Sequence, residues 1–197
     1  MRRTGPAFVL GFALCLASAP GLRAAVGLRA GVWYGTQGVN DLRIDAAYGA
    51  GETFVTFPCF ELRFGSGWTL AAGYEVGYNR STVMGPYDYP ATFKMSGAVL
   101  LAGYEFRTGR AAIFAQGGVG QFAYAQTVVN PSVPDRPVDA RQMAGLAAAG
   151  IRIYPVDAFY VGLEARYVSL KVKPYDVTVD LGGWRFAVGA GFAVDFR

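Results

Sequence analysis

The stretch from Gly183 to Arg197, GWRFAVGAGFAVDFR, decides the fold of this chain. Every second residue is apolar, from Trp184 through Val188 to Phe196, and the residues between them are small or charged. A period of two predicts a β-strand, because successive side chains in a strand point to opposite faces. The length and the aromatic residue at each end are typical of a strand that spans a bilayer between lipid and a lumen.

The same alternation recurs along the rest of the chain. Seven further segments show it, at 26–34, 53–64, 68–78, 93–106, 111–127, 143–154 and 158–170. Short links at 65–67, 107–110 and 155–157 alternate with long polar ones at 35–52, 79–92, 129–142 and 171–182. Even strand numbers and alternating short and long links are typical of bacterial outer-membrane barrels. The sequence therefore predicts an all-β protein, an eight-stranded antiparallel up-and-down transmembrane β-barrel over residues 26–197.

Three places leave the details of this barrel open. Pro58 has no backbone N–H to donate, so it predicts a bulge or irregular pairing in its strand. The run 99–101, Val-Leu-Leu, is apolar in both phases and leaves the inner and outer faces of 93–106 undecided. The pair Gly117-Gly118 lies within 111–127 and is able to break the register of that strand, so the inner and outer faces of 111–127 are undecided as well.

The first 25 residues predict a cleaved signal peptide. Two arginines at Arg2 and Arg3 precede an apolar run of about a dozen residues, which is too short to span a membrane as a helix. Loss of Arg2, Arg3 and Arg23 with this segment lowers the formal charge from +4 to +1. No basic patch then remains to indicate a nucleic-acid partner. Only Cys59 remains of the two cysteines, so the mature chain has no internal disulfide.

Charged residues of both signs fall on the inward phase of the predicted strands. Eight strands enclose a lumen that side chains fill, so these charges are expected to pair with one another rather than line a water channel. The predicted lumen charge network consists of Arg29, Glu61, Arg63, Glu75, Arg152, Glu164, Arg166, Arg185 and Asp195. A charge-lined route for a solute is the alternative interpretation.

The signal segment, eight alternating strands, four long loops and a terminal strand ending in an aromatic residue resemble the small outer-membrane barrel superfamily that includes OmpA-type, OmpX-type and OmpW-type proteins. This resemblance covers 26–197 and implies insertion into the bacterial outer membrane, facing lipid and lipopolysaccharide. It also implies that the barrel-assembly machinery reads Phe192, Val194 and Phe196 as an assembly signal, although Arg197 follows the aromatic residue here.

The sequence lacks the residues that the common catalytic sites of barrel enzymes need. The chain contains no histidine, which barrel hydrolases and proteases use as their general base. A lone Cys59 cannot build a thiolate zinc site. The glycines near Gly117 lie within a strand pattern with no helix after them, so they do not indicate a phosphate-binding loop. We therefore expect no enzyme activity, no cofactor and no metal.

Two non-catalytic functions remain. The first is a structural or adhesin-like surface protein that meets a host or extracellular ligand through its loops, with Tyr87, Tyr89 and Tyr175 as candidate recognition residues. The second is an OmpW-like narrow channel or binding pocket for small hydrophobic molecules, which needs an apolar lumen. A soluble lipocalin-like barrel is the rival architecture, and the export signal and aromatic strand ends favour the membrane.

Overall fold

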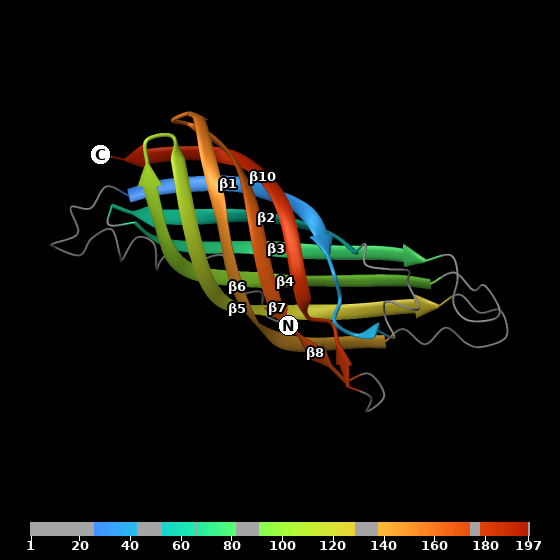
Figure 1. Cartoon of the computed structure of the whole chain (residues 1–197). Coiled ribbons are helices and arrows are strands. Elements are labelled where there is room, and N and C mark those ends of the chain that lie inside the picture. The colour runs from blue at the N-terminus through green and yellow to red at the C-terminus, as the bar shows by residue number, and fades with distance from the viewer. Residues whose placement is uncertain are drawn as a thin grey trace, which may run out of the picture.

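The computed structural model describes residues 26–42, 53–65, 67–81, 91–128, 138–173 and 178–196, and these form a closed antiparallel β-barrel (Figure 1). Around the barrel the strands follow the order β1-β10-β7-β6-β5-β4-β3-β2. The prediction of an all-β, eight-stranded up-and-down barrel is confirmed. The barrel strands are β1 (Val26–Gln37), β2 (Thr53–Phe64), β3 (Trp68–Ser81), β4 (Ala91–Thr108), β5 (Ala111–Val128), β6 (Val138–Val156), β7 (Phe159–Ser169) and β10 (Gly183–Phe196).

The barrel closes where its first and last strands meet. β1 pairs with β10 without interruption from Val26↔Phe196 to Gln37↔Arg185. The two ends of the described chain therefore lie side by side, at the end of the barrel that also carries the short connections (Figure 1). Closure gives every strand a neighbour on both sides, which a sheet in hydrocarbon requires because no water is there to bond a free edge.

The two faces of the barrel wall differ sharply. On β10 the outward residues Trp184, Val188 and Phe192 are 55%, 58% and 68% exposed, whereas the inward Arg185 is 3% exposed. Large apolar side chains are likewise exposed on the outside of all eight strands. Such an outer wall would be unfavourable in water and suits hydrocarbon. Within the described residues, no helix has the length and hydropathy to cross a membrane.

The structure settles the three open details. Pairing of β5 with both neighbours runs through Gly117 and Gly118 without a shift, so these glycines do not break the register. Val99 and Leu101 face inward and Leu100 outward, which fixes the faces of β4. The β2–β3 ladder is interrupted between Thr56↔Val76 and Cys59↔Gly73 without a change of register, so Pro58 causes irregular pairing rather than a bulge. The described register shift lies instead between β6 and β7, at 153–156.

Inward glycines make room for large aromatic side chains in the lumen. A Cβ atom built on Gly189 would overlap the indole ring of Trp33. Gly73 faces the ring of Phe57 in the same way. This pairing of a glycine with an aromatic ring fills a lumen that would be too narrow for two large side chains at the same level.

We expect Gly189→Ala to destabilise the barrel by about 1–3 kcal/mol, because overpacking forces Trp33 out of its position. The measurement is urea unfolding of the protein in phospholipid vesicles, followed by tryptophan fluorescence. Gly145→Ala is the matched control, since a Cβ there meets nothing within 4 Å. Equal stability of the two variants would contradict the packing described for Trp33.

Candidate functional site

The lumen near the end with the short connections contains a closed ring of four charges, which we call the charge ring. Arg29 lies 2.5 Å from Glu61 and 2.6 Å from Glu105, measured between guanidinium nitrogen and carboxylate oxygen. Arg152 lies 2.9 Å from Glu61 and 2.6 Å from Glu105. Each arginine therefore bridges both carboxylates, and each carboxylate bridges both arginines. All four residues are at most 3% exposed, so the ring satisfies its charges internally.

Polar neighbours complete the charge ring. The Gln116 side-chain amide donates to Glu61 Oε2 at 2.8 Å and to Thr69 Oγ1 at 3.1 Å. Arg63 Nε lies 3.4 Å from Glu105 Oε1, and its side chain is 19% exposed at the edge of the cluster. Buried carboxylates therefore have hydrogen-bond donors in addition to the two arginines, which reduces the cost of their desolvation.

A second group of charges lies toward the opposite end of the lumen and forms a line rather than a ring; we call it the charge chain. Glu75 contacts Arg185 through one carboxylate oxygen and Arg166, at 3.1 Å, through the other. Arg166 also lies 2.6 Å from Glu164. The cavity beside these residues has a volume of only about 10 Å³, which is room for about one water molecule. The lumen is closed at this level.

Aromatic side chains separate the two charged groups. Trp33 and Phe114 have ring centroids 6.0 Å apart. The guanidinium carbon of Arg152 lies 4.2 Å from the Phe114 centroid, and that of Arg166 lies 4.2 Å from the Phe57 centroid. Arginine faces on aromatic rings are favourable electrostatically and suit buried sites with little water. Charges and rings together fill the lumen.

The structure brings most of the predicted lumen residues together. Arg29, Glu61 and Arg152 lie in the charge ring, and Glu75, Glu164, Arg166 and Arg185 form the charge chain. Arg63 lies at the edge of the ring. Asp195 stands apart from both groups: its side chain is 41% exposed and lies 3.7 Å from Arg107 at the end of the barrel. It is close to the end of its strand, where the lumen meets solvent.

Sequence reasoning missed Glu105 and Gln116. Glu105 lies on β4 and Gln116 on β5, the two strands whose inner and outer faces the sequence leaves undecided. Glu105 shares its phase with Val99 and Leu101, and the outward Tyr104 and Phe106 flank it. A charged residue between two aromatic residues near a strand end was the available signal for an inward position.

The opposite end of the lumen is apolar and covered. A short hairpin, β8 (Lys171–Val172) and β9 (Val179–Asp180), lies there together with residues 38–41. Asn40 N donates to Gly182 O at 2.9 Å, and the Gln37 side-chain amide donates to Leu181 O at 2.8 Å. Buried apolar side chains from this cover pack on those of the barrel; they include Leu170, Val172, Leu181, Met95, Phe122, Leu146 and Val168. The sequence predicts a long loop at 171–182, and the structure shows this hairpin within it instead.

At the same end β6 extends beyond its neighbour. β6 has 19 residues and β7 has 11, and their pairing begins at Gly145↔Ser169. Residues 138–144 of β6 therefore pair only with β5 among the described strands; β8 lies beside β6 but forms its ladder with β9. We call this segment the open edge of β6. Arg141 and Met143 on it are exposed.

The predicted recognition residues Tyr87, Tyr89 and Tyr175 lie outside the described residues. Phe192, Val194 and Phe196 are described: they point outward on β10 and are more than half exposed. Among the described residues, no group of three or more Cys, Asp or Glu side chains is placed to hold a metal ion.

Comparison with known proteins identifies the fold. No family model matches the sequence, and no curated protein sequence matches it. Neisserial surface protein A is similar in structure with a TM-score of 0.56 at 11% identity, over 85% of this chain and 96% of that one. Ail of Yersinia pestis, solved in complex with the heparin analogue sucrose octasulfate, gives a TM-score of 0.53 at 15% identity, over 87% of this chain and 99% of that one. The closed barrel, its apolar outer wall and these neighbours show that the chain has the fold of the small β-barrel proteins of bacterial outer membranes.

Proposed function

We propose that this outer-membrane barrel is a non-catalytic surface protein, structural or adhesin-like, that acts through its extracellular end. The observation that carries this proposal is the filled lumen. The charge ring, the aromatic layer of Trp33, Phe57 and Phe114, and the charge chain follow one another along the barrel, and the cavity left beside the charge chain is about 10 Å³. A solute would have to separate buried ion pairs in order to pass, which is costly.

The extracellular end offers what a surface protein needs. The short connections and both ends of the described chain lie together, so we assign that end to the periplasm and the opposite end to the outside. At this end β6 extends beyond its pairing with β7, and among the described strands residues 138–144 pair only with β5; a strand edge of this kind favours the addition of an extended strand from a partner. Exposed cations lie at the same end, at Lys94, Arg141, Lys171 and Lys173.

Loop residues and export complete the proposal. Tyr87, Tyr89 and Tyr175 would add aromatic contacts to a bound partner. Residues 1–25 would act as the cleaved export signal, and Phe192, Val194 and Phe196 would be read by the assembly machinery. Ail, which shares the fold, is known in complex with sucrose octasulfate, so this polyanion is a suitable first probe for the cations of the extracellular end.

We expect no stepwise conductance when the refolded protein is inserted into planar bilayers, with a water-filled porin as positive control. The reason is the filled lumen, and single-channel recording makes the measurement. A steady conductance in the nanosiemens range would contradict the proposal and favour the narrow channel.

In a second experiment, cells that display the protein should bind a heparin-coated surface more strongly than cells that do not. Arg141→Glu should weaken this binding without changing the amount of folded barrel.

A hydrophobic-molecule pocket remains the second candidate. The apolar side chains at the extracellular end of the lumen, among them Phe122, Leu146 and Val168, are the observation in its favour. They are in contact with the cover formed by β8, β9 and residues 38–41, so a ligand would have to displace Leu170 and Leu181. The second candidate would be supported if the protein took up a fluorescent apolar probe and if changes in this cover altered the uptake.

A further inference from the structure

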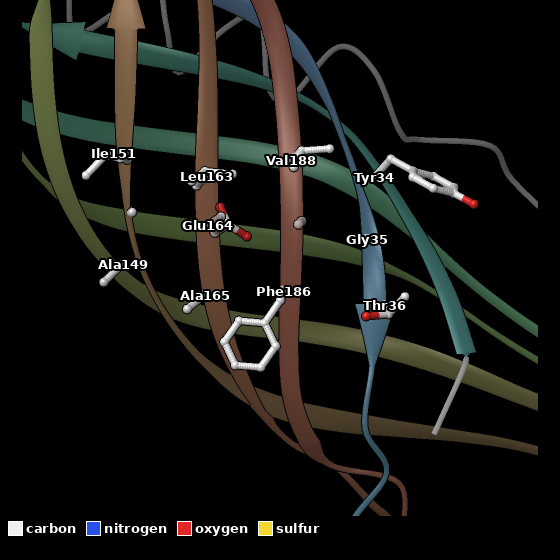
Figure 2. Close-up of a pocket in the computed structure, with 12 residues that line it drawn as sticks. Tyr34, Gly35, Thr36, Ala149, Ile151, Leu163, Glu164, Ala165, Phe186 and Val188 are labelled. Atoms are coloured by element: carbon white, nitrogen blue, oxygen red, sulfur yellow. The ribbon is translucent and has the colours of Figure 1, made fainter. Parts of the chain in front are cut away.

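The membrane-facing wall of the barrel carries a continuous hollow, which we call the wall groove. The part nearest the extracellular end, of about 570 Å³, lies across β1, β10, β7 and β6 (Figure 2). A second hollow of about 520 Å³ shares Ile151, Leu163 and Val188 with the first. A third of about 380 Å³ shares Val32 and Ala190 with the second. Neighbouring hollows with common walls form one groove along the outside of the barrel.

Small residues form the floor of the wall groove. Ala149 on β6 and Ala165 on β7 are direct partners in the ladder, and both side chains face outward. Phe186, Leu163 and Ile151 rise beside them (Figure 2). Packing inside the barrel does not require these alanines, because their side chains point away from the lumen. Their small size therefore shapes only the outer surface.

Measured along the membrane normal, the wall groove is about as long as one leaflet is thick. From Phe186 to Phe192 it follows six residue steps of β10, which is about 20 Å at about 3.3 Å per residue. Strands of such barrels tilt by roughly 35–45°, so this run corresponds to about 15 Å of depth. The hydrocarbon core of a bilayer is about 30 Å thick, so a leaflet accounts for about half of that. One extended acyl chain fits this length.

Exposed lysines follow β7, the strand that forms one wall of the groove, toward the extracellular end. Along β7 and β8 the exposed row continues from Tyr167 through Ser169 to Lys171 and Lys173, while Leu170 and Val172 between them are buried. Tyr167 packs edge-on against Trp184 at a centroid distance of 5.4 Å. Aromatic pairs of this kind mark the membrane interface, so the lysines lie beyond it, at the level of lipid headgroups. Their charge is complementary to a phosphate group.

We propose that the wall groove binds one acyl chain of a phosphorylated outer-leaflet lipid of the lipid A type, and that Lys171 and Lys173 receive its phosphate. In hydrocarbon, apolar side chains gain nothing from leaving water, so shape and packing decide what stays bound. A flexible acyl chain follows the floor of alanines, whereas a second barrel would need a matching ridge. The inference rests on the membrane placement and on the assignment of the extracellular end made under the proposed function, and it does not require surface adhesion.

Native mass spectrometry of the folded barrel released from detergent tests the inference, with diphosphoryl lipid A and phosphatidylethanolamine as separate probes. We expect one lipid A molecule to be retained per barrel and phosphatidylethanolamine to bind more weakly. The double variant A149L/A165L fills the floor and should weaken lipid A binding about tenfold. K171Q/K173Q should weaken it as well. Ala72→Leu is the matched control, because Ala72 is an exposed alanine on β3 outside the groove, and it should bind lipid A normally.

Three results would overturn the inference. The first is equal lipid A binding by A149L/A165L and by Ala72→Leu. The second is equal binding of the two lipids by the unchanged protein. The third is a lipid-independent dimer that A149L/A165L abolishes, which would assign the groove to a second copy of the chain. Heat-modifiable migration on a gel verifies that each variant is folded. If A149L/A165L fails to fold, Phe186→Ala, which removes one flank of the groove, replaces it with the same expected loss.

Discussion

Glu105→Ala should lower the free energy of unfolding of the barrel by about 3–5 kcal/mol, the range for removal of one partner from a buried ion pair. Glu105 accepts from Arg29 at 2.6 and 2.7 Å and from Arg152 at 2.6 Å, and it is 1% exposed. Without it the two arginines share Glu61 alone, and a buried positive charge is left without compensation. Urea unfolding in phospholipid vesicles measures the loss.

Two controls make this prediction specific to the charge ring. The double variant E105M/R152M removes one charge of each sign and leaves Arg29 paired with Glu61, so it should lose less stability than Glu105→Ala alone. The side chain of Asp157 is 99% exposed and pairs with Arg107. Asp157→Ala breaks only this exposed pair, so it should change the free energy of unfolding by less than about 1 kcal/mol. If E105M/R152M were less stable than Glu105→Ala, Glu105 would act through packing rather than through its charge.

The sequence predicts the barrel well because one physical rule governs every strand. A side chain in a two-faced wall meets either hydrocarbon or the lumen, so the alternation along 183–196 carries both the strand and its orientation. The bounds of β2 and β10 agree with the predicted segments 53–64 and 183–196. β6 begins at Val138, several residues before the predicted start at 143, because its pairing with β5 continues beyond the membrane into a polar stretch.

The candidate site was less predictable because it depends on which strands meet across the lumen. Arg29 and Glu61 are ladder partners, so their pairing follows from adjacent strands. Glu105 and Arg29 lie 76 positions apart on strands that are not neighbours in the barrel. Only closure brings them together, and a sequence pattern does not contain the distance across a lumen. The hairpin of β8 and β9 was missed for a related reason: its two-residue strands are too short to show a period.

Arginine at Val188 should destabilise the barrel by about 2–4 kcal/mol, whereas arginine at Trp184 should cost about 0–1 kcal/mol. Both residues point outward on β10 and have similar exposure, 58% and 55%. They differ in depth: Trp184 packs with Tyr167 near the extracellular end, and Val188 lies toward the middle of the strand, between Tyr34 and Leu163. A charge at the interface keeps its hydration, but one near the midplane must give it up or distort the bilayer.

Comparison of each arginine variant with alanine at the same position separates the cost of the charge from the loss of packing. Val188→Ala and Trp184→Ala supply these references, and unfolding in urea from vesicles of a single phospholipid gives all four values. A charge cost that is the same at both positions would mean that the outer wall of β10 does not cross hydrocarbon. A larger cost at Val188 would support the assignment of the apolar face of this strand to lipid, and with it the depth on which the wall groove depends.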